Sequence, residues 1–248
     1  MNQPTFSHLP YPTDYMDIAV KKVKNHFKDN FKNKKVLDIP AGNGWIVEQL
    51  TEYGMEVISA DINEEKSHFA QVDMEKPLPF SDEEFDAIIC CEGIEHIFSP
   101  FQLFTEFART LKKRGGILII TTPNIQNLYS RWQFLCSGYL FQFDPFDKIP
   151  LKDNVIGDKG HISHVSYGQL RYYTEHHRMK VESPTGGRMK RKILLPFLLP
   201  VLLIGFWWNY RDWKRTSGKV SRKEIIKHLF NLRILLSRSL VFIAIKPK

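Results

Sequence analysis

An apolar run that ends in an acid and then a glycine-containing turn constrains this chain more than any other feature. Residues 36–39 are strand-like and include Asp38, and Gly42 and Gly44 follow before a helical pattern begins at Trp45. A turn built on glycine lets a ligand approach the backbone amides, because no Cβ stands in the way. The helix behind the turn directs its N-terminus at the same ligand. The segment therefore predicts a strand, a ligand-binding turn and a helix.

Four further segments continue this pattern along the chain. A second strand-like run ends at Asp61, 17 residues after Gly44, and the others are residues 71–74, 85–96 and 111–124. Neighbouring strands of a doubly wound sheet end side by side, where an acid can accept both hydroxyls of a ribose. Strands that alternate with helices predict an α/β fold, with a mostly parallel sheet covered by helices on both faces.

The ordered series resembles the class I S-adenosylmethionine-dependent methyltransferases over roughly residues 34–183. The family's first motif usually reads D-x-G-x-G-x-G, and here Pro40 replaces the first glycine. The resemblance implies a Rossmann-like sheet of seven strands, S-adenosylmethionine as the cofactor, and methyl transfer as the reaction. It also implies nine cofactor-binding residues: Asp38, Ala41, Gly42 and Gly44 towards the methionine end, Asp61 and Ile62 at the ribose, Asp73 and Met74 at the adenine, and Glu92 on the sulfonium side.

A dinucleotide-binding dehydrogenase is a competing interpretation with the same architecture. Its fingerprint requires a third glycine three residues after the second. The residues that follow Gly44 are Trp45, Ile46 and Val47. The missing glycine and the presence of Asp73 favour the methyltransferase.

Three histidines are candidates for a catalytic base. His96 follows the fourth strand, and His161 and His164 precede a helix. Ligands of doubly wound folds bind beyond the carboxyl ends of the strands, so all three are expected at the reacting end. A neutral histidine can remove the proton of an acceptor hydroxyl, although each can equally be a structural hydrogen-bonding residue. A metal site is the other alternative, with His161 and His164 as a pair and Glu95 or His96 as a further ligand. No third ligand stands at a motif spacing, so no metal is expected.

Positive charge is concentrated in the last quarter of the chain. The net charge is +8, yet residues 1–185 carry 20 Lys and Arg against 25 Asp and Glu, whereas residues 186–248 carry 15 against 2. Within the basic part, residues 193–208 carry no charge and include two prolines. A membrane-spanning helix needs about 20 apolar residues, so this run is slightly short.

Cations lie on both sides of this apolar run, at residues 188–192 and 211–215. A spanning helix keeps its excess of Lys and Arg on the cytoplasmic side, so the pattern favours a segment held within one leaflet. A buried core helix or a dimer interface is the alternative. Nucleic acid is a less favoured partner, because the aromatic residues lie within the apolar run and not among the basic residues. We expect a cytoplasmic protein attached, peripherally or monotopically, to the inner face of the cytoplasmic membrane.

The apolar and basic segment is expected to be an insertion before the last strand. Residues 179–182 read as the sixth strand, residues 221–238 as a basic amphipathic helix and residues 239–246 as the last strand. Three cysteines provide no disulfide framework or zinc-binding spacing. The predicted organisation is a methyltransferase domain of residues 1–186 with 239–248, and a membrane-associating insertion of residues 187–238.

The regions around the fifth strand suggest a finer resemblance. The sequence Thr122-Pro123-Asn124, the aromatic-rich connection 125–160 and the apolar–basic insertion resemble bacterial methyltransferases of surface-glycan assembly. This resemblance implies O-methylation of a sugar or lipid-linked glycan at the membrane, with residues 125–160 shaping the acceptor pocket. The alternatives are a quinone or lipid O-methyltransferase, and a membrane-bound binding protein that has lost the reaction. Residues 92–95 lack the Asn/Asp-Pro-Pro-aromatic turn of nucleic-acid amino-methyltransferases.

Overall fold

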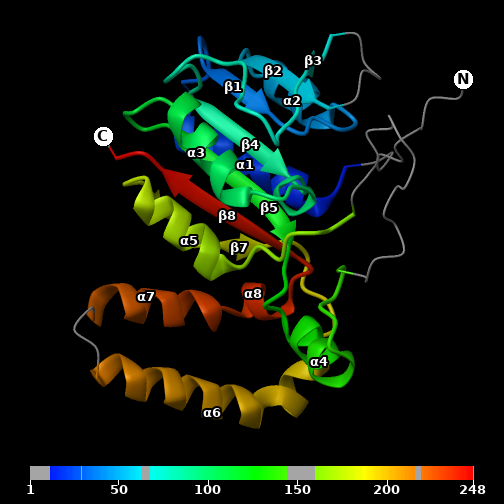
Figure 1. Cartoon of the computed structure of the whole chain (residues 1–248), viewed down its shortest axis with the longest axis vertical. Coiled ribbons are helices and arrows are strands. Elements are labelled where there is room, and N and C mark those ends of the chain that lie inside the picture. The colour runs from blue at the N-terminus through cyan, green and yellow to red at the C-terminus, as the bar shows by residue number, and fades with distance from the viewer. Residues whose placement is uncertain (1–11, 29, 63–67, 144–159, 216–218, 248) are drawn as a thin grey trace, which may run out of the picture.

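Eight strands form one sheet in the computed structural model, which describes residues 12–28, 30–62, 68–143, 160–215 and 219–247. The strand order is β3-β2-β1-β4-β5-β8-β6, and β7 pairs with β8 beside this path (Figure 1). The strands are β1 (Lys35–Asp38), β2 (Glu56–Asp61), β3 (Ala70–Gln71), β4 (Ala87–Cys91), β5 (Ile117–Pro123), β6 (Lys180–Val181), β7 (Thr185–Gly186) and β8 (Ser239–Ile245).

The first five strands are parallel and the last strand runs against them. In register, Val36 of β1 lies beside Val57 of β2 and beside Ala87 of β4, while Ile117 of β5 pairs with Ile245 of the antiparallel β8. The predicted mostly parallel α/β sheet is confirmed, and β7 adds a short eighth strand to the seven expected. The carboxyl ends of β1, β2, β4 and β5 therefore meet at one edge.

Helices cover both faces of this sheet. Helices α1 and α2 pack on one face, and α3 and α5 pack on the other. The helices are α1 (Asp14–Phe27), α2 (Trp45–Thr51), the short 3₁₀ helix η1 (Ile94–His96), α3 (Pro100–Thr110), α4 (Leu128–Ser137), α5 (Tyr167–His176), α6 (Leu194–Arg215), α7 (Lys219–Leu229) and α8 (Leu232–Leu236).

The central strands are apolar throughout because both of their faces are buried. In β4, Ile88 belongs to the cluster beneath α3 and α5, whereas Ile89 belongs to the cluster beneath α1 and α2. Leu118 and Ile119 of β5 divide in the same way. A parallel sheet covered on both faces requires such continuous apolar strands. The sheet thereby fixes its strand ends, and the polar residues that follow them, in place.

Helices α6, α7 and α8 lie between β7 and β8 in the chain. Leu202 of α6 and Leu235 of α8 form a small apolar cluster with Leu128 of α4. The structure divides the helix expected at residues 221–238 into α7 and α8. The division occurs at Asn231, whose side chain accepts a hydrogen bond of 2.8 Å from the backbone N–H of Arg233 and caps α8.

A buried polar network fixes α7 to α5. The Tyr167 hydroxyl lies 2.6 Å from Nδ1 of His228, and Nη1 of Arg171 donates to the same hydroxyl at 3.1 Å. Arg171 also forms an ion pair with Glu224 of α7 at 3.1 Å. Because Tyr167, His228 and Arg171 are buried, the helical segment is held firmly against the sheet domain.

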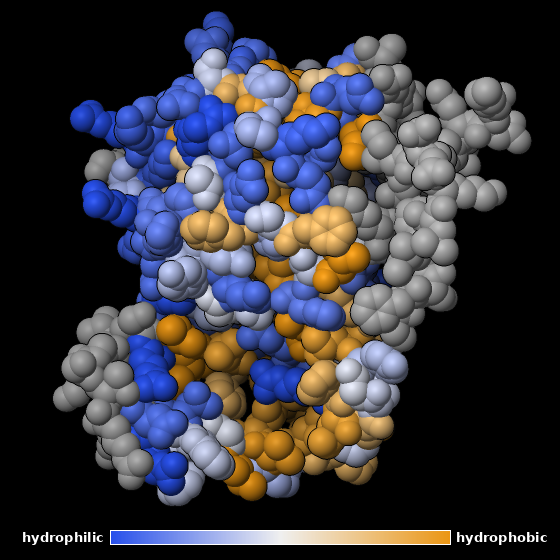
Figure 2. Space-filling model, in the orientation of Figure 1, coloured by the Kyte–Doolittle hydropathy of each residue, from blue (hydrophilic) through white to orange (hydrophobic). Residues whose placement is uncertain are grey.

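Helix α6 is apolar but mostly exposed. Its segment Leu194–Asp212 has a mean hydropathy of 1.2, and 6% of that window is buried. By length and composition alone the helix is able to cross a membrane, a criterion that core helices also meet. Phe197 is 74% exposed, Val201 64% and Trp207 59%. Figure 2 shows hydrophobic side chains gathered at the lower right of the molecule, over α4 and the first part of α6.

Candidate active site

The glycine turn lies at the carboxyl ends of β1 and β2. Gly42 and Gly44 have φ angles of 51° and 78°, a left-handed conformation that favours glycine. The backbone N–H of Gly42 donates to Oδ2 of Asp61 at 2.9 Å, so the acid at the end of β2 holds the turn. Pro40 is accommodated because it faces Gly93, where a Cβ would come within 2.4 Å of the proline ring.

Asp38 is a fully buried acid at the end of β1. Neither of its carboxylate oxygens has a hydrogen-bond partner among the described residues. Burial, and next the negative charge of Asp61, raise the pKa of Asp38 well above its usual value. A buried carboxylate without a partner is costly, and a positively charged ligand would relieve that cost. Ala41, also buried, donates its N–H to the carbonyl of Ala60 at 2.9 Å and keeps the turn beside β2.

Asp73 and Met74 follow β3 at the same edge. The N–H of Val72 donates to the carbonyl of Asp61 at 2.8 Å, which extends the pairing of β3 with β2 towards Asp73. Asp73 accepts a hydrogen bond of 3.0 Å from the N–H of Glu75 and forms an ion pair with Lys76, so it also shapes its own turn. Met74 packs on the core, and Ile62 is half-buried directly after β2.

Glu92 follows β4 with a positive φ of 48°. Its Oε1 accepts a hydrogen bond of 3.2 Å from the hydroxyl of Thr121, and its side chain also accepts one from Ser239. Burial raises the pKa of Glu92 to about 7. The side chain therefore changes its charge near neutral pH, at the place where the sequence predicts the sulfonium.

Glu95 is fully buried in η1 and organises the segment that carries His161. Its backbone carbonyl accepts hydrogen bonds of 2.9 Å from the N–H groups of Ile162 and Ser163. Its Oε2 accepts from the hydroxyl of Thr122 at 3.1 Å, and Oε1 has no hydrogen-bond partner among the described residues. Burial, together with the charge of Glu92, raises the pKa of Glu95 well above the usual range.

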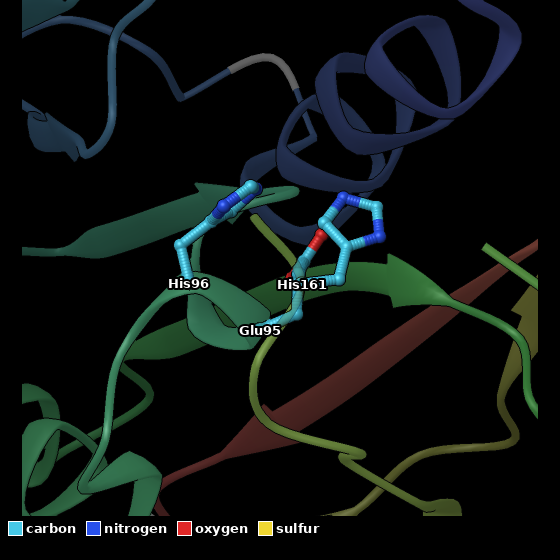
Figure 3. A group of neighbouring side chains, drawn as sticks. All are labelled: Glu95, His96 and His161. Atoms are coloured by element: carbon cyan, nitrogen blue, oxygen red, sulfur yellow. The ribbon is translucent and has the colours of Figure 1, made fainter. Parts of the chain in front are cut away.

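Glu95, His96 and His161 form a cluster, with one potential ligand atom from each lying within 4.8 Å of the others. Figure 3 shows the Glu95 carboxyl between the two imidazole rings. Nδ1 of His161 lies 2.6 Å from the carbonyl oxygen of Gln142, which selects the tautomer with hydrogen on Nδ1 and leaves the lone pair on Nε2. The cluster can accept a proton, and its two nitrogens and one oxygen are also a donor set for a divalent metal ion.

His164 is exposed and is not part of this cluster. Its ring contacts Phe143, with ring centroids 4.5 Å apart, and Phe143 also contacts His161 at 5.4 Å. The structure thus brings together two of the three predicted catalytic histidines. The connection 125–160 is predicted to shape the acceptor pocket, and its residues 144–159 lie outside the described residues.

Other residues at this edge received no place in the site from the sequence. The hydroxyls of Thr121 and Thr122 donate hydrogen bonds to Glu92 and Glu95. Two polar residues at the end of an apolar strand are the sequence pattern that could have indicated these threonines. Burial, and next the charge of Glu92, raise the pKa of Tyr15 in α1, which indicates that this helix borders the site. Arg238 provides a positive charge near Glu92 from a remote part of the chain.

Comparisons with known proteins agree with this geometry. Residues 37–120 match the methyltransferase domain family. Similar curated proteins include ubiquinone biosynthesis O-methyltransferases of Dinoroseobacter shibae (30% identity over 107 residues, 38% of this chain and 43% of that protein) and Dechloromonas aromatica (25% over 150 residues, 55% and 60%). The chain therefore spans about half the length of the curated relatives it matches.

Solved structures share the fold at low sequence identity. A SAM-dependent methyltransferase from Archaeoglobus fulgidus aligns with a TM-score of 0.56 and 19% identity, covering 93% of this chain and 94% of that one. The 1,6-didemethyltoxoflavin-N1-methyltransferase of Burkholderia thailandensis, solved with S-adenosylhomocysteine, aligns with a TM-score of 0.53 and 11% identity over 94% and 79%. The chain has the fold of these solved methyltransferases, and its residues 37–120 match a methyltransferase domain.

The acids at the sheet edge fit S-adenosylmethionine, the cofactor that the sequence predicts. The molecule carries a positive ammonium group and a positive sulfonium group. Asp38 has buried carboxylate oxygens that lack partners among the described residues, as a site for a cation requires. Asp61 and Glu92 bring further negative charge to the same edge, where Arg238 is the cation that acts on Glu92.

Proposed function

We propose that this chain is an S-adenosylmethionine-dependent O-methyltransferase that acts on a sugar or lipid-linked glycan at the inner face of the cytoplasmic membrane. The supporting observation is the cluster of Glu95, His96 and His161 at the strand edge that also carries Asp38 and the glycine turn. A proton acceptor beside a bound methyl donor is what hydroxyl methylation needs.

The cofactor supplies the methyl group as part of a sulfonium, and the chain positions it. Asp38 takes the ammonium group, Asp61 takes the ribose hydroxyls, and ionised Glu92 favours the sulfonium. The reaction is an in-line displacement, so alignment of the acceptor oxygen contributes much of the rate. Asp61 holds the Gly42 amide as well, so the turn and the ribose site are fixed together.

A histidine of the cluster removes the proton of the acceptor hydroxyl. His161 is the stronger candidate, because its Nδ1 is anchored on the Gln142 carbonyl and its Nε2 has the lone pair. His96 lies beside it, with the ring centroids 4.8 Å apart. A positioned base of this kind contributes roughly a hundred- to ten-thousandfold in rate.

The exposed surface of α6 supports attachment to a membrane. Ile193 is 72% exposed and Phe197 is 74% exposed, and burial of each such side chain contributes about 1.5–3 kcal/mol. The Arg211 guanidinium lies over the rings of Trp207 and Trp208, a combination suited to the headgroup layer. We place the apolar run of α6 within one leaflet, because cations precede it at residues 188–192 and follow it at residues 211–215.

A quinone or lipid hydroxyl is the second candidate acceptor. The names of the curated relatives favour it, and such an acceptor would also be reached from a membrane surface. A binding protein that keeps the fold without the reaction is the third.

Incubation with isotopically labelled S-adenosylmethionine and fractionated membrane extracts separates these possibilities. Label in a glycolipid whose mass rises by one CH₂ group supports the first proposal. Label in a quinone precursor supports the second. Cofactor binding without transfer to any fraction supports the binding protein. Failure of calorimetry to detect S-adenosylmethionine binding would refute all three.

A further inference from the structure

A basic pocket lies at the base of α6, outside the cluster of Glu95, His96 and His161. It is formed where the start of α4, the segment that leads into α6 and the end of α8 meet. Its polar lining includes Lys190, Arg191 and Arg238, together with Asn127 and Ser237. We call it the Lys190–Arg191–Arg238 pocket.

Among the described residues none of the three cations forms a direct ion pair, although the charge of Arg238 acts on Glu92, and all three are exposed. The guanidinium of Arg191 lies over the ring of Tyr129, 3.7 Å from its centroid, and 5.0 Å from that of Phe141. Arg238 lies 5.8 Å from the same Phe141 ring. Stacking on aromatic faces fixes a guanidinium and leaves the N–H groups at its edge available to a planar or tetrahedral anion.

The N-terminus of α4 adds to the positive potential. Asn127 caps the helix by accepting the N–H of Ser130 at 2.8 Å, and Leu128 and Tyr129, the first two helical residues, line the pocket. A helix N-terminus attracts anions through its dipole and its unpaired N–H groups. Cations and a helix N-terminus around one pocket provide the charge and the N–H donors that a phosphate group requires.

Two neighbouring features indicate where that phosphate comes from. The exposed apolar side chains of Ile193 and Phe197 begin directly beyond Arg191, so a phosphate in the pocket and a hydrocarbon chain on α6 would be held together. On the other side, the carbonyl of Arg238 accepts the N–H of Asn124 at the end of β5, at 2.9 Å. Ser239, the next residue, contacts Glu92.

We infer that the Lys190–Arg191–Arg238 pocket binds the phosphate of a membrane lipid and holds a phosphate-linked acceptor between α6 and the methyl-transfer site. That the lipid is the acceptor rests on the proposed function; that it is a lipid phosphate rests on the pocket and α6.

The test uses the full chain and vesicles of phosphatidylcholine with or without phosphatidate. The variant Lys190→Gln/Arg191→Gln should bind phosphatidate vesicles about tenfold more weakly than the parent, as expected for loss of charge-assisted hydrogen bonds. Its binding to pure phosphatidylcholine should stay unchanged, because the choline cation neutralises the phosphate of that lipid and because α6 is intact. Arg233→Gln removes a charge from an exposed residue of α8 outside the pocket and should stay within about twofold of the parent, since exposed charges contribute little.

If Arg233→Gln lost as much affinity for phosphatidate vesicles per removed charge as the pocket variant, the binding would be general surface attraction. That result would overturn the assignment of the pocket. Calorimetry should also compare pyrophosphate binding by the parent and by the pocket variant. If the variant lost pyrophosphate binding but bound vesicles as the parent does, the ligand would be a free phosphate, and the lipid assignment would be overturned. Titration with S-adenosylmethionine keeps the two proposals distinguishable. A pocket variant that binds the cofactor normally but has lost phosphatidate preference supports the pocket, whereas a parent that does not bind the cofactor refutes the methyltransferase proposal alone.

Discussion

Replacement of Asp38 by alanine should stabilise the cofactor-free protein while it weakens cofactor binding. The carboxylate is fully buried and its oxygens lack partners among the described residues. A buried polar group without a partner costs about 1–3 kcal/mol, and the small cavity left by alanine offsets part of the gain. A net gain of about 1–2 kcal/mol corresponds to a rise in Tm of roughly 2–8 °C for a chain of this size.

The same substitution removes the proposed partner of the cofactor's ammonium group. Loss of a charge-assisted hydrogen bond of about 1.5–3 kcal/mol weakens binding roughly ten- to a hundredfold. The measurements are thermal unfolding with and without S-adenosylmethionine, and calorimetric titration. Asp86→Ala is the matched control: it lies at the opposite end of β4, where it forms ion pairs with Lys34 at 3.0 Å and Lys112 at 2.6 Å. This control should lower Tm and leave cofactor affinity unchanged.

The stabilisation should also depend on pH with a definite sign. The pKa of Asp38 is raised in the folded state, so its ionisation opposes folding above the ordinary carboxyl pKa of about 3.9. The advantage of Asp38→Ala over the parent should therefore be small near pH 4 and grow as the pH rises towards neutrality. A variant that is less stable than the parent at pH 7 and binds the cofactor equally well would show that Asp38 is a structural residue, and would refute this reasoning.

Four further results are expected. His161→Ala should lower kcat about a hundredfold or more through loss of the base, whereas exposed His164→Ala should change it little, as turnover assays would show. Cofactor affinity should rise with pH through about 7 as Glu92 ionises, and Glu92→Gln should flatten that profile in calorimetric titrations. Burial lowers the pKa of His228, so the protein should lose stability as the pH falls below about 6.5, the ordinary histidine value, and Tyr167→Phe should cost about 1 kcal/mol in denaturant unfolding. Phe197→Ser on α6 should weaken binding to neutral vesicles roughly ten- to a hundredfold, because it removes about 1.5–3 kcal/mol of apolar burial.

Each expectation can fail in a specific way. Turnover lost on treatment with a chelator and restored by Mn²⁺ would assign Glu95, His96 and His161 to a metal ion in place of base catalysis. Cofactor binding that is independent of pH between 6 and 8 would remove Glu92 from the sulfonium side. A Tm that stays constant down to pH 5 would contradict the role given to His228. Unchanged vesicle binding by the α6 variant would indicate that α6 forms an interface with protein.

The fold and the strand-end acids were predictable from local pattern. Asp38 and Asp61 end two apolar runs separated by a glycine turn and a helix, and parallel neighbours necessarily end at the same edge. The same logic placed Glu92 and His96 there. Their functional roles stay predictions, but their positions follow from the period of the strands.

Other parts of the site depend on packing that no local pattern records. Arg238 reaches the edge because β8 runs antiparallel and begins beside the end of β5, which pairs Ser239 with Pro123. His161 lies beside Glu95 because the N–H groups of Ile162 and Ser163 donate to the Glu95 carbonyl. His164, three residues further along the chain, lies outside the cluster, although no local pattern distinguishes it from His161. The break at Asn231 was signalled by a capping residue within an otherwise helical pattern.

The helical segment between β7 and β8 starts and ends at nearly the same point. Gly186 pairs with Leu240, and the hydroxyl of Ser237 donates to the carbonyl of Gly187 at 3.0 Å. An inserted segment whose ends lie so close together can be replaced by one of different length without moving any strand of the sheet. A protein built on this scaffold can thus acquire or discard a helical attachment by replacement of a single contiguous stretch, while the strand ends that carry the site keep their geometry.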